Sequence, residues 1–215
     1  MQYKNLNIKW LGNSGFLIQF DSMNIYIDPI KLTNFNEKAD LVLITHGHHD
    51  HFSVEDIKKI LKNNTKMIGP PEILSQSRQV KDGIDFKIAE VGKNLNFNEM
   101  VISPVHAYNI NKPFHSKGDG VGYILDIDGT TIYHAGDSDI IPEMKEIKCD
   151  IALLPVSGKF TMTAEEAARA AEIIHSDLAI PMHYGTLIGT KEDAERFVSL
   201  CDGKGIKAMV MEKEI

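Results

Sequence analysis

The chain has 215 residues, 43% of them hydrophobic and 25% charged, which is typical of one globular domain with a sizeable core, although two small domains remain an alternative. Thirty acidic and 23 basic side chains give a net charge of -7, which repels a phosphate polymer, so nucleic acid is not an expected partner. The lack of a bilayer-length apolar run or an apolar export segment predicts a cytoplasmic protein without a membrane partner. The two cysteines, Cys149 and Cys201, are far apart in the sequence and predict neither a disulfide framework nor a zinc knuckle.

The first part of the chain predicts three short strands. Residues 7–11 and 15–20 alternate apolar and polar side chains around the turn-forming Gly12-Asn13-Ser14, which predicts a pair of strands. A third strand over residues 24–29 stops at its proline, because proline supplies no ladder donor. Taken alone, Asp28 before that proline is as well explained as a simple turn residue as it is as a residue with a function.

The densest signal is the segment from His46 to His51, in which four imidazoles and a carboxylate occupy six positions. A lone histidine is usually a core residue, but four together are not a packing choice. The β-branched run over residues 40–45 predicts a buried strand before the segment. Helical spacing after Ser53 predicts a helix capped by Ser53 or Asp50. The histidine segment therefore lies at the end of a strand.

The residue types in this segment suit metal ions. His46 and His48, two apart on extended chain, point the same way, whereas Asp50 and His51 follow in a turn. One segment could therefore give two ligands to each of two ions. Imidazole nitrogen and carboxylate oxygen suit zinc, manganese or iron, whereas calcium prefers oxygen ligands.

The pattern His46-x-His48-x-Asp50-His51 after an apolar strand resembles the metal-ligand signature of the metallo-β-lactamase-fold superfamily. The resemblance implies an α/β (α+β) fold, a four-layer αββα sandwich, formed by a single hydrolase domain over residues 1–215. It also implies two divalent metal ions as cofactors, with zinc expected first and manganese second. The family's remaining ligands lie singly along the chain, so each can be sought in the rest of the sequence.

Further strands end in residues of the same kinds. An apolar strand over 100–105 leads into His106, a hairpin over 121–134 leads into Asp137, and a strand over 178–182 leads into His183. The other expected elements are a strand over 65–71, a helix over 72–79, an antiparallel meander over 81–98, a short helix from 141, a strand over 149–156, a capped helix over 163–175, a helix over 191–201 and a strand over 206–211.

The resemblance assigns a role to each matching residue. The metal ligands would be His46, His48 and His106 on one ion, Asp50, His51 and His183 on the other, and Asp137 between both. Asp50 and Asp137 would be catalytic, with Asp50 also holding or relaying a proton. Asp28 and His134 would support the ligands without binding metal.

Two metals lower the pKa of a bridging water, so the implied chemistry is hydrolysis by a metal-bridging hydroxide. Diiron oxidoreductases of the family place an acid where this chain has His48, and the β-lactamases proper lack a histidine at His51 or use a cysteine ligand. The β-CASP nucleases need a large inserted domain, which the chain lacks. The chain most resembles compact zinc-dependent hydrolases related to ascorbate-6-phosphate lactonase, which implies a small, anionic ester, lactone or phosphodiester. A diiron oxidoreductase and a metal-stabilised ligand-binding protein are the alternatives.

Residues 108–120 mix polar, aromatic, cationic and glycine residues without a period, which predicts a loop. It is either a solvated connection or a lid that binds an anionic substrate group through Lys112, His115 or Lys117. A homo-oligomer is left open.

Overall fold

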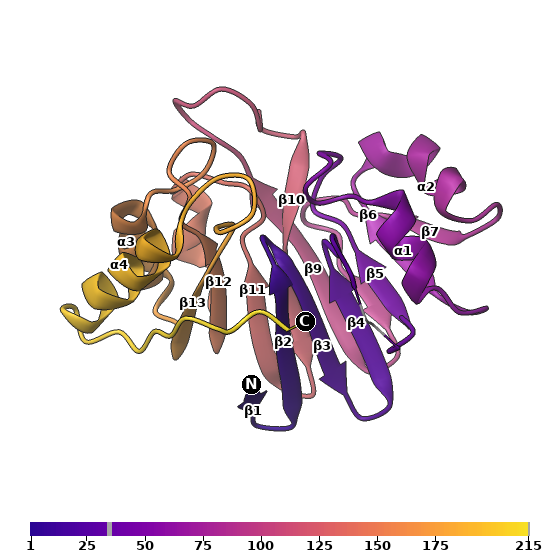
Figure 1. Cartoon of the computed structure of the whole chain (residues 1–215), viewed down its shortest axis with the longest axis horizontal. Coiled ribbons are helices and arrows are strands. Elements are labelled where there is room, and N and C mark those ends of the chain that lie inside the picture. The colour runs from indigo at the N-terminus through magenta and orange to yellow at the C-terminus, as the bar shows by residue number, and fades with distance from the viewer. Residues whose placement is uncertain (34–35, 215) are drawn as a thin grey trace. The chain divides into compact units, whose positions relative to one another are not determined.

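The computed structural model describes residues 1–33 and 36–214. The chain divides into two compact units, one formed by Met1–Ala89 with Glu212–Ile215 and the other by Glu90–Met211. Each unit contains one β-sheet with its own helices (Figure 1). Within the described residues, no helix combines the length and the apolar character that crossing a bilayer requires.

The first unit contains a seven-stranded sheet in the order β1 to β7. Its strands are β1 (Gln2–Tyr3), β2 (Leu6–Gly12), β3 (Gly15–Phe20), β4 (Met23–Ile27), β5 (Leu41–Leu43), β6 (Lys66–Gly69) and β7 (Asp85–Ile88). The pairs from β1 to β4 are antiparallel, and those from β4 to β7 are parallel. Helices α1 (Val54–Ile60) and α2 (Leu74–Val80), the latter after a 3₁₀ turn at Pro71–Ile73, cover this sheet, because their apolar residues share one buried cluster with strand residues such as Tyr26, Val42 and Met67.

Both ends of the chain belong to the first unit. Lys213 forms a single parallel bridge with Trp10, and the Glu214 N–H donates to the Trp10 carbonyl at 2.9 Å. The ammonium of Lys9 also lies 3.2 Å from the Glu214 carboxylate. The C-terminal segment is therefore fastened to β2.

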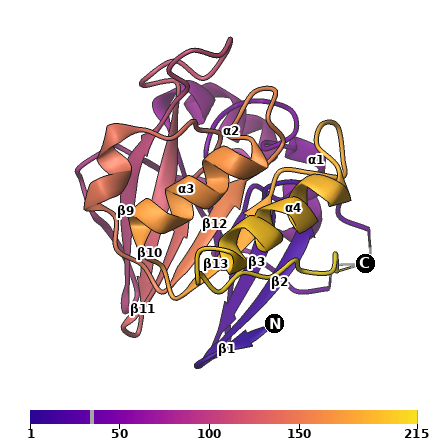
Figure 2. The ribbon, with the colours of Figure 1, turned by 90° about the vertical axis from the view of Figure 1, so that its left-hand side faces the viewer.

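The second unit contains a six-stranded sheet in the order β13-β12-β11-β10-β9-β8. Its strands are β8 (Leu95–Phe97), β9 (Met100–Ala107), β10 (Gly120–Ile127), β11 (Thr130–His134), β12 (Ile151–Pro155) and β13 (Leu178–Met182). Asp128 and Gly129 both have positive φ, as a two-residue hairpin turn between β10 and β11 requires. Helices α3 (Ala164–Ile174) and α4 (Lys191–Asp202) lie side by side over β12 and β13 (Figure 2), and a 3₁₀ helix spans Pro142–Glu146.

The predicted helix starts are confirmed in detail. The Ser53 hydroxyl accepts the Asp56 N–H at 3.2 Å, so Ser53 caps α1. Thr163 and Glu166 form the reciprocal capping box that begins α3. The sequence had left Asp50 as the alternative cap of α1, and the structure selects Ser53.

Two predicted strand arrangements are wrong. The expected antiparallel meander over residues 81–98 is instead two strands in different sheets, because β7 pairs parallel with β6 and β8 pairs antiparallel with β9. Alternation along a strand reports its two faces but not the direction of its partner. The expected strand over 206–211 is a single bridge between Ala208 and Ala179, since the segment follows β13 for too few residues to build a ladder.

Candidate metal centre

The histidine segment of the first unit turns sharply after β5. The N–H groups of His51 and Phe52 both donate to the His48 carbonyl at 2.9 Å, which closes a turn directly before α1. This turn brings the His51 ring back beside the His46 ring, with centroids 4.0 Å apart, so the expected separation of the two ligand pairs is not seen. The Nε2 of His46 lies 3.0 Å from the Nδ1 of His48, so these two rings present adjacent nitrogens. His46 and His51 are buried, whereas His48 is exposed.

Asp28 organises the histidine segment from the end of β4. Its buried carboxylate accepts the Thr45 N–H at 2.8 Å, the Thr45 hydroxyl at 2.6 Å and the His51 Nδ1–H at 2.7 Å. Because the Thr45 hydroxyl gives its proton to Asp28, its oxygen can accept the Nδ1–H of His46, which lies 3.0 Å away. Both imidazoles are then protonated at Nδ1, so each keeps the Nε2 lone pair that a metal requires.

Asn13 is a further residue of this cluster that the sequence interpretation missed. It is fully buried, and its side-chain amide donates to the Asp50 carbonyl at 3.0 Å and lies 3.4 Å from the Asp50 Oδ2. The sequence predicts Asn13 only as part of a turn, and its left-handed φ of 51° agrees with that prediction. No pattern in the sequence indicates that this turn reaches Asp50.

In the second unit, two histidine side chains meet at the carboxylate of Asp137. The Nε2 of His183, which follows β13, lies 3.1 Å from the Asp137 Oδ2. The Nε2 of His115, from the loop between β9 and β10, lies 3.4 Å from the same oxygen. All three side chains are buried. The structure therefore brings together the two predicted ligands of this unit that follow β11 and β13, and adds His115.

Local backbone requirements position Asp137. A Cβ on Gly122 of β10 would lie only 2.9 and 3.1 Å from the carbonyl oxygens of His134 and Ala135, so glycine lets the segment that leads to Asp137 approach the strand. The buried His134 accepts the Gly136 N–H on its Nδ1 at 3.2 Å. His134 thus supports the turn that presents Asp137 and has a structural role.

His106, the remaining predicted ligand of this unit, lies near the end of β9. It pairs with Val121 inside the sheet, and its half-buried ring contacts the Tyr108 ring edge-on with centroids 6.2 Å apart. Within the described residues its imidazole makes no hydrogen bond or ion pair. In the second unit it is His115, rather than His106, that contacts Asp137.

The loop over residues 108–120 holds His115 in one orientation. The Nδ1 of His115 lies 3.2 Å from both the Phe160 carbonyl and the side-chain amide nitrogen of Asn109. When Nδ1 carries the ring proton and donates to the Phe160 carbonyl, Nε2 is the lone-pair atom. The N–H of Asn109 donates to the His115 carbonyl at 2.8 Å, and its side-chain amide donates to the Phe160 carbonyl at 2.7 Å. Phe114 and His115 both have left-handed φ, 67° and 55°, which turns the imidazole inward.

The two lysines of this loop are engaged by carboxylates. Lys112 pairs with Asp139 and Glu166 and donates to the Thr161 carbonyl at 2.8 Å. Burial lowers the pKa of Lys112, but the bonds to both carboxylates outweigh it and hold the pKa above its usual value. The Lys117 ammonium lies 2.6 Å from Glu143, which raises its pKa. An anionic ligand would have to compete with these carboxylates, so the predicted anion binding by these lysines stays a prediction.

The donor atoms within each unit suit a metal ion. A tetrahedral zinc ion with ligand bonds of about 2.0–2.1 Å holds its donor atoms roughly 3.3 Å apart. The His46–His48, His183–Asp137 and His115–Asp137 pairs, at 3.0, 3.1 and 3.4 Å, have this spacing. Imidazole nitrogens fixed as lone-pair donors, together with carboxylates, also form the ligand set that zinc and manganese accept.

Comparisons with known proteins match nearly the whole chain. The profile of the family described as the beta-lactamase superfamily domain matches residues 7–183. A UPF0173 metal-dependent hydrolase of Methanopyrus kandleri is 31% identical, with 96% of each chain covered. The solved structure of a protein from Parabacteroides distasonis has a TM-score of 0.86 and 31% identity, covering 97% of this chain and 94% of that one. The metallo hydrolase Igni18 from Ignicoccus hospitalis has a TM-score of 0.82 and 29% identity, covering 98% and 96%.

Proposed function

This chain belongs to the beta-lactamase superfamily, and on that premise we propose that it is a hydrolase that depends on two divalent metal ions. The observation that supports the proposal most directly is the ligand-like spacing of oriented imidazole and carboxylate atoms in each unit. The name of the Methanopyrus kandleri relative, a metal-dependent hydrolase, agrees with this chemistry.

The proposed ligands differ from the sequence prediction at one position. His46 and His48 stay with one ion, Asp50, His51 and His183 with the other, and Asp137 with both. His115 takes the place predicted for His106, because His115 is buried, is held through its Nδ1 by Asn109 and Phe160, and contacts Asp137. His106 has none of these properties.

Bound divalent ions would supply activation of a water molecule near neutral pH and polarisation of the scissile bond. The protein's own residues then have defined tasks. Asp28 and the Phe160 carbonyl fix ring orientation at His51 and His115, as partners of metal-bound histidines do. The proposed task of Asp50 is to hold or relay a proton, and its half-buried position and its contacts with Asn13 support this proposal.

The proposed substrate is a small ester, lactone or phosphodiester, and its anionic character stays a prediction. Zinc is proposed ahead of manganese, because fixed imidazole donors suit zinc well. A cytoplasmic location stays a prediction from the sequence, and a homo-oligomeric state stays open.

Metal content and turnover together test the proposal. The purified protein should contain about two equivalents of zinc or manganese by mass spectrometry of the metals. It should also hydrolyse at least one member of a panel of lactones, thioesters and phosphodiesters. Iron with oxygen uptake would favour a diiron oxidoreductase, and bound metal without any turnover would favour a ligand-binding protein. Either result would overturn the proposal.

A pair of matched variants tests the choice of His115. His115→Ala should lose metal, whereas His106→Ala should retain it, because only the former removes a donor that contacts Asp137. Loss of metal from His106→Ala with retention in His115→Ala would restore the original prediction.

A further inference from the structure

Two aromatic rings border His115. Phe114 precedes His115 in the chain, and the carbonyl oxygen of Phe160 lies 3.2 Å from the His115 Nδ1. The two rings contact each other edge-on, with centroids 5.4 Å apart and an interplanar angle of 84°. The backbone that orients His115 therefore also presents an aromatic pair.

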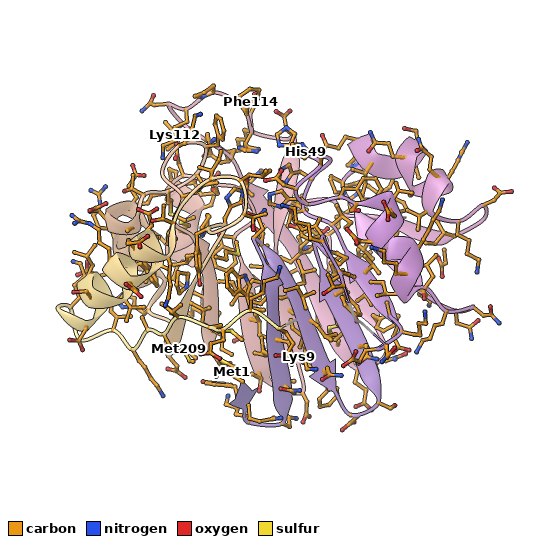
Figure 3. The ribbon with its side chains drawn as sticks, in the orientation of Figure 1. Met1, Lys9, His49, Lys112, Phe114 and Met209 are labelled. Atoms are coloured by element: carbon orange, nitrogen blue, oxygen red, sulfur yellow. The ribbon has the colours of Figure 1, made fainter. Side chains whose placement is uncertain are left out.

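The exposure of this pair is unusual for its residue type. Phe114 is 62% exposed although its ring is large and apolar, and Phe160 is half-buried. Figure 3 shows Phe114 on the loop that projects beyond β9 and β10. A lone exposed apolar side chain needs no special role, but the Phe114 ring contacts a second ring and directly precedes a proposed metal ligand in the chain.

The loop is held in place and is not a loose connection. The left-handed φ of Phe114, 67°, is strained for a bulky residue and persists only where surrounding bonds fix it. Those bonds come from Asn109, which is buried and donates to the carbonyls of Phe114 at 3.3 Å and Phe160 at 2.7 Å. Consecutive Cα atoms are about 3.8 Å apart, so the Phe114 ring is fixed within one residue of a proposed metal ligand.

The two lysines of the same loop are already paired with carboxylates and are therefore less available to a substrate. Lys112 and Lys117 are paired with Asp139, Glu166 and Glu143. A substrate anion would have to displace a carboxylate to reach either ammonium.

We propose that Phe114 and Phe160 bind an aromatic or apolar group that lies next to the scissile bond of the substrate. The inference rests on the proposed function, and it names the substrate class as one with an apolar group beside the hydrolysed linkage. The aromatic pair is the part of the site that distinguishes such a substrate from a smaller or purely polar one.

Binding of two hydroxamates to the zinc-loaded protein tests the inference without a known substrate. Acetohydroxamate and phenylacetohydroxamate carry the same zinc-binding group, and only the second adds a phenyl ring. Isothermal titration calorimetry should show that phenylacetohydroxamate binds about 3- to 10-fold more tightly, the usual gain from aromatic pairs. The ratio should fall towards one in Phe114→Ala and in Phe160→Ala.

Met209→Ala is the matched control, since Met209 is also an exposed apolar residue of the second unit. The Met209 N–H donates to the carbonyl of Ala179 near the start of β13, whereas His183 follows the end of that strand. Figure 3 shows Met209 far from Phe114. This variant should keep the wild-type ratio. Equal affinities for both hydroxamates in the wild type, or a ratio unchanged in both phenylalanine variants, would overturn the inference. Failure of both hydroxamates to bind would instead overturn the proposed metal centre, and the inference with it.

Discussion

Replacing Asp28 with asparagine keeps the shape of the side chain but removes its charge and one of its two acceptor oxygens. In the native protein this carboxylate accepts three hydrogen bonds of 2.6–2.8 Å, two from Thr45 and one from His51. Asparagine can accept only on one oxygen, and its amide must face Thr45 or His51 as a donor. Where it faces His51, Nδ1 has to accept, and the ring proton moves to Nε2. The His51 lone pair then no longer points away from residue 28.

The expected magnitudes follow from these three bonds. Hydrogen bonds to a charged group contribute about 1.5–3 kcal/mol each, and a buried donor left without its acceptor costs about 1–3 kcal/mol. Asp28→Ala should therefore lower the free energy of unfolding by about 3–5 kcal/mol. Asp28→Asn, which keeps one acceptor, should lose about 1–3 kcal/mol. Because Asp28 orients a proposed ligand, Asp28→Asn should also weaken zinc binding about 10- to 100-fold.

Two measurements separate stability from metal binding. Urea unfolding of the metal-free variants gives the stability change, and competition with a chromophoric chelator gives the zinc affinity of the folded protein. Asp82→Ala, at an exposed position of the same unit, is the control and should change neither quantity. Wild-type zinc affinity in Asp28→Asn would refute the proposed orienting role of Asp28, even if the protein were less stable.

Three further predictions concern an ion pair, the two cysteines and the number of domains. The Lys117 ammonium beside Glu143 lowers the pKa of that carboxyl from 4.5 to about 2. The ion pair therefore stabilises the folded protein above pH 4.5, and this stabilisation is lost as the pH falls towards 2. Glu143→Gln should therefore be less stable than wild type at neutral pH and equally stable near pH 2 in urea unfolding, and a constant difference would contradict this. Burial raises the pKa of Cys149 to about 12 and that of Cys201 to about 11, so neither thiol should react with a disulfide reagent at neutral pH before denaturation, and rapid labelling of the folded protein would be the contrary result. Because both chain ends belong to the first unit, the predicted single domain should unfold in one calorimetric transition, whereas two separate transitions would indicate two domains.

Much of the fold could be predicted from local patterns. Apolar runs, turn residues and capping boxes identified most strands and helices, and the metallo-β-lactamase fold predicted from the histidine motif is confirmed by full-length structural similarity. The strand directions near residues 81–98 could not be obtained in this way. Pairing of β7 with β6 depends on contacts between segments and not on alternation within one segment.

The candidate site could be predicted where its residues are contiguous in the sequence. It was less predictable where the conformation of a loop brings a residue into the site. His46 to His51 form one segment whose density identified it. His115 lies 22 positions before Asp137 in the chain, and what joins them is the conformation of residues 108–120, including two left-handed residues that no periodicity reveals. The same limit applies to Asn13, which reaches Asp50 only through a folded turn.

Left-handed backbone is what several proposed site residues share. Asp28, His115 and His183 have φ values of 44°, 55° and 60°. Such a conformation costs about 1–3 kcal/mol for a residue other than glycine, so the site stores strain that the surrounding hydrogen bonds must hold. Glycine would relieve that strain but would remove the carboxylate or imidazole. A metal ion that binds only the folded chain stabilises it by mass action, and would thereby offset strain that the metal-free protein bears alone.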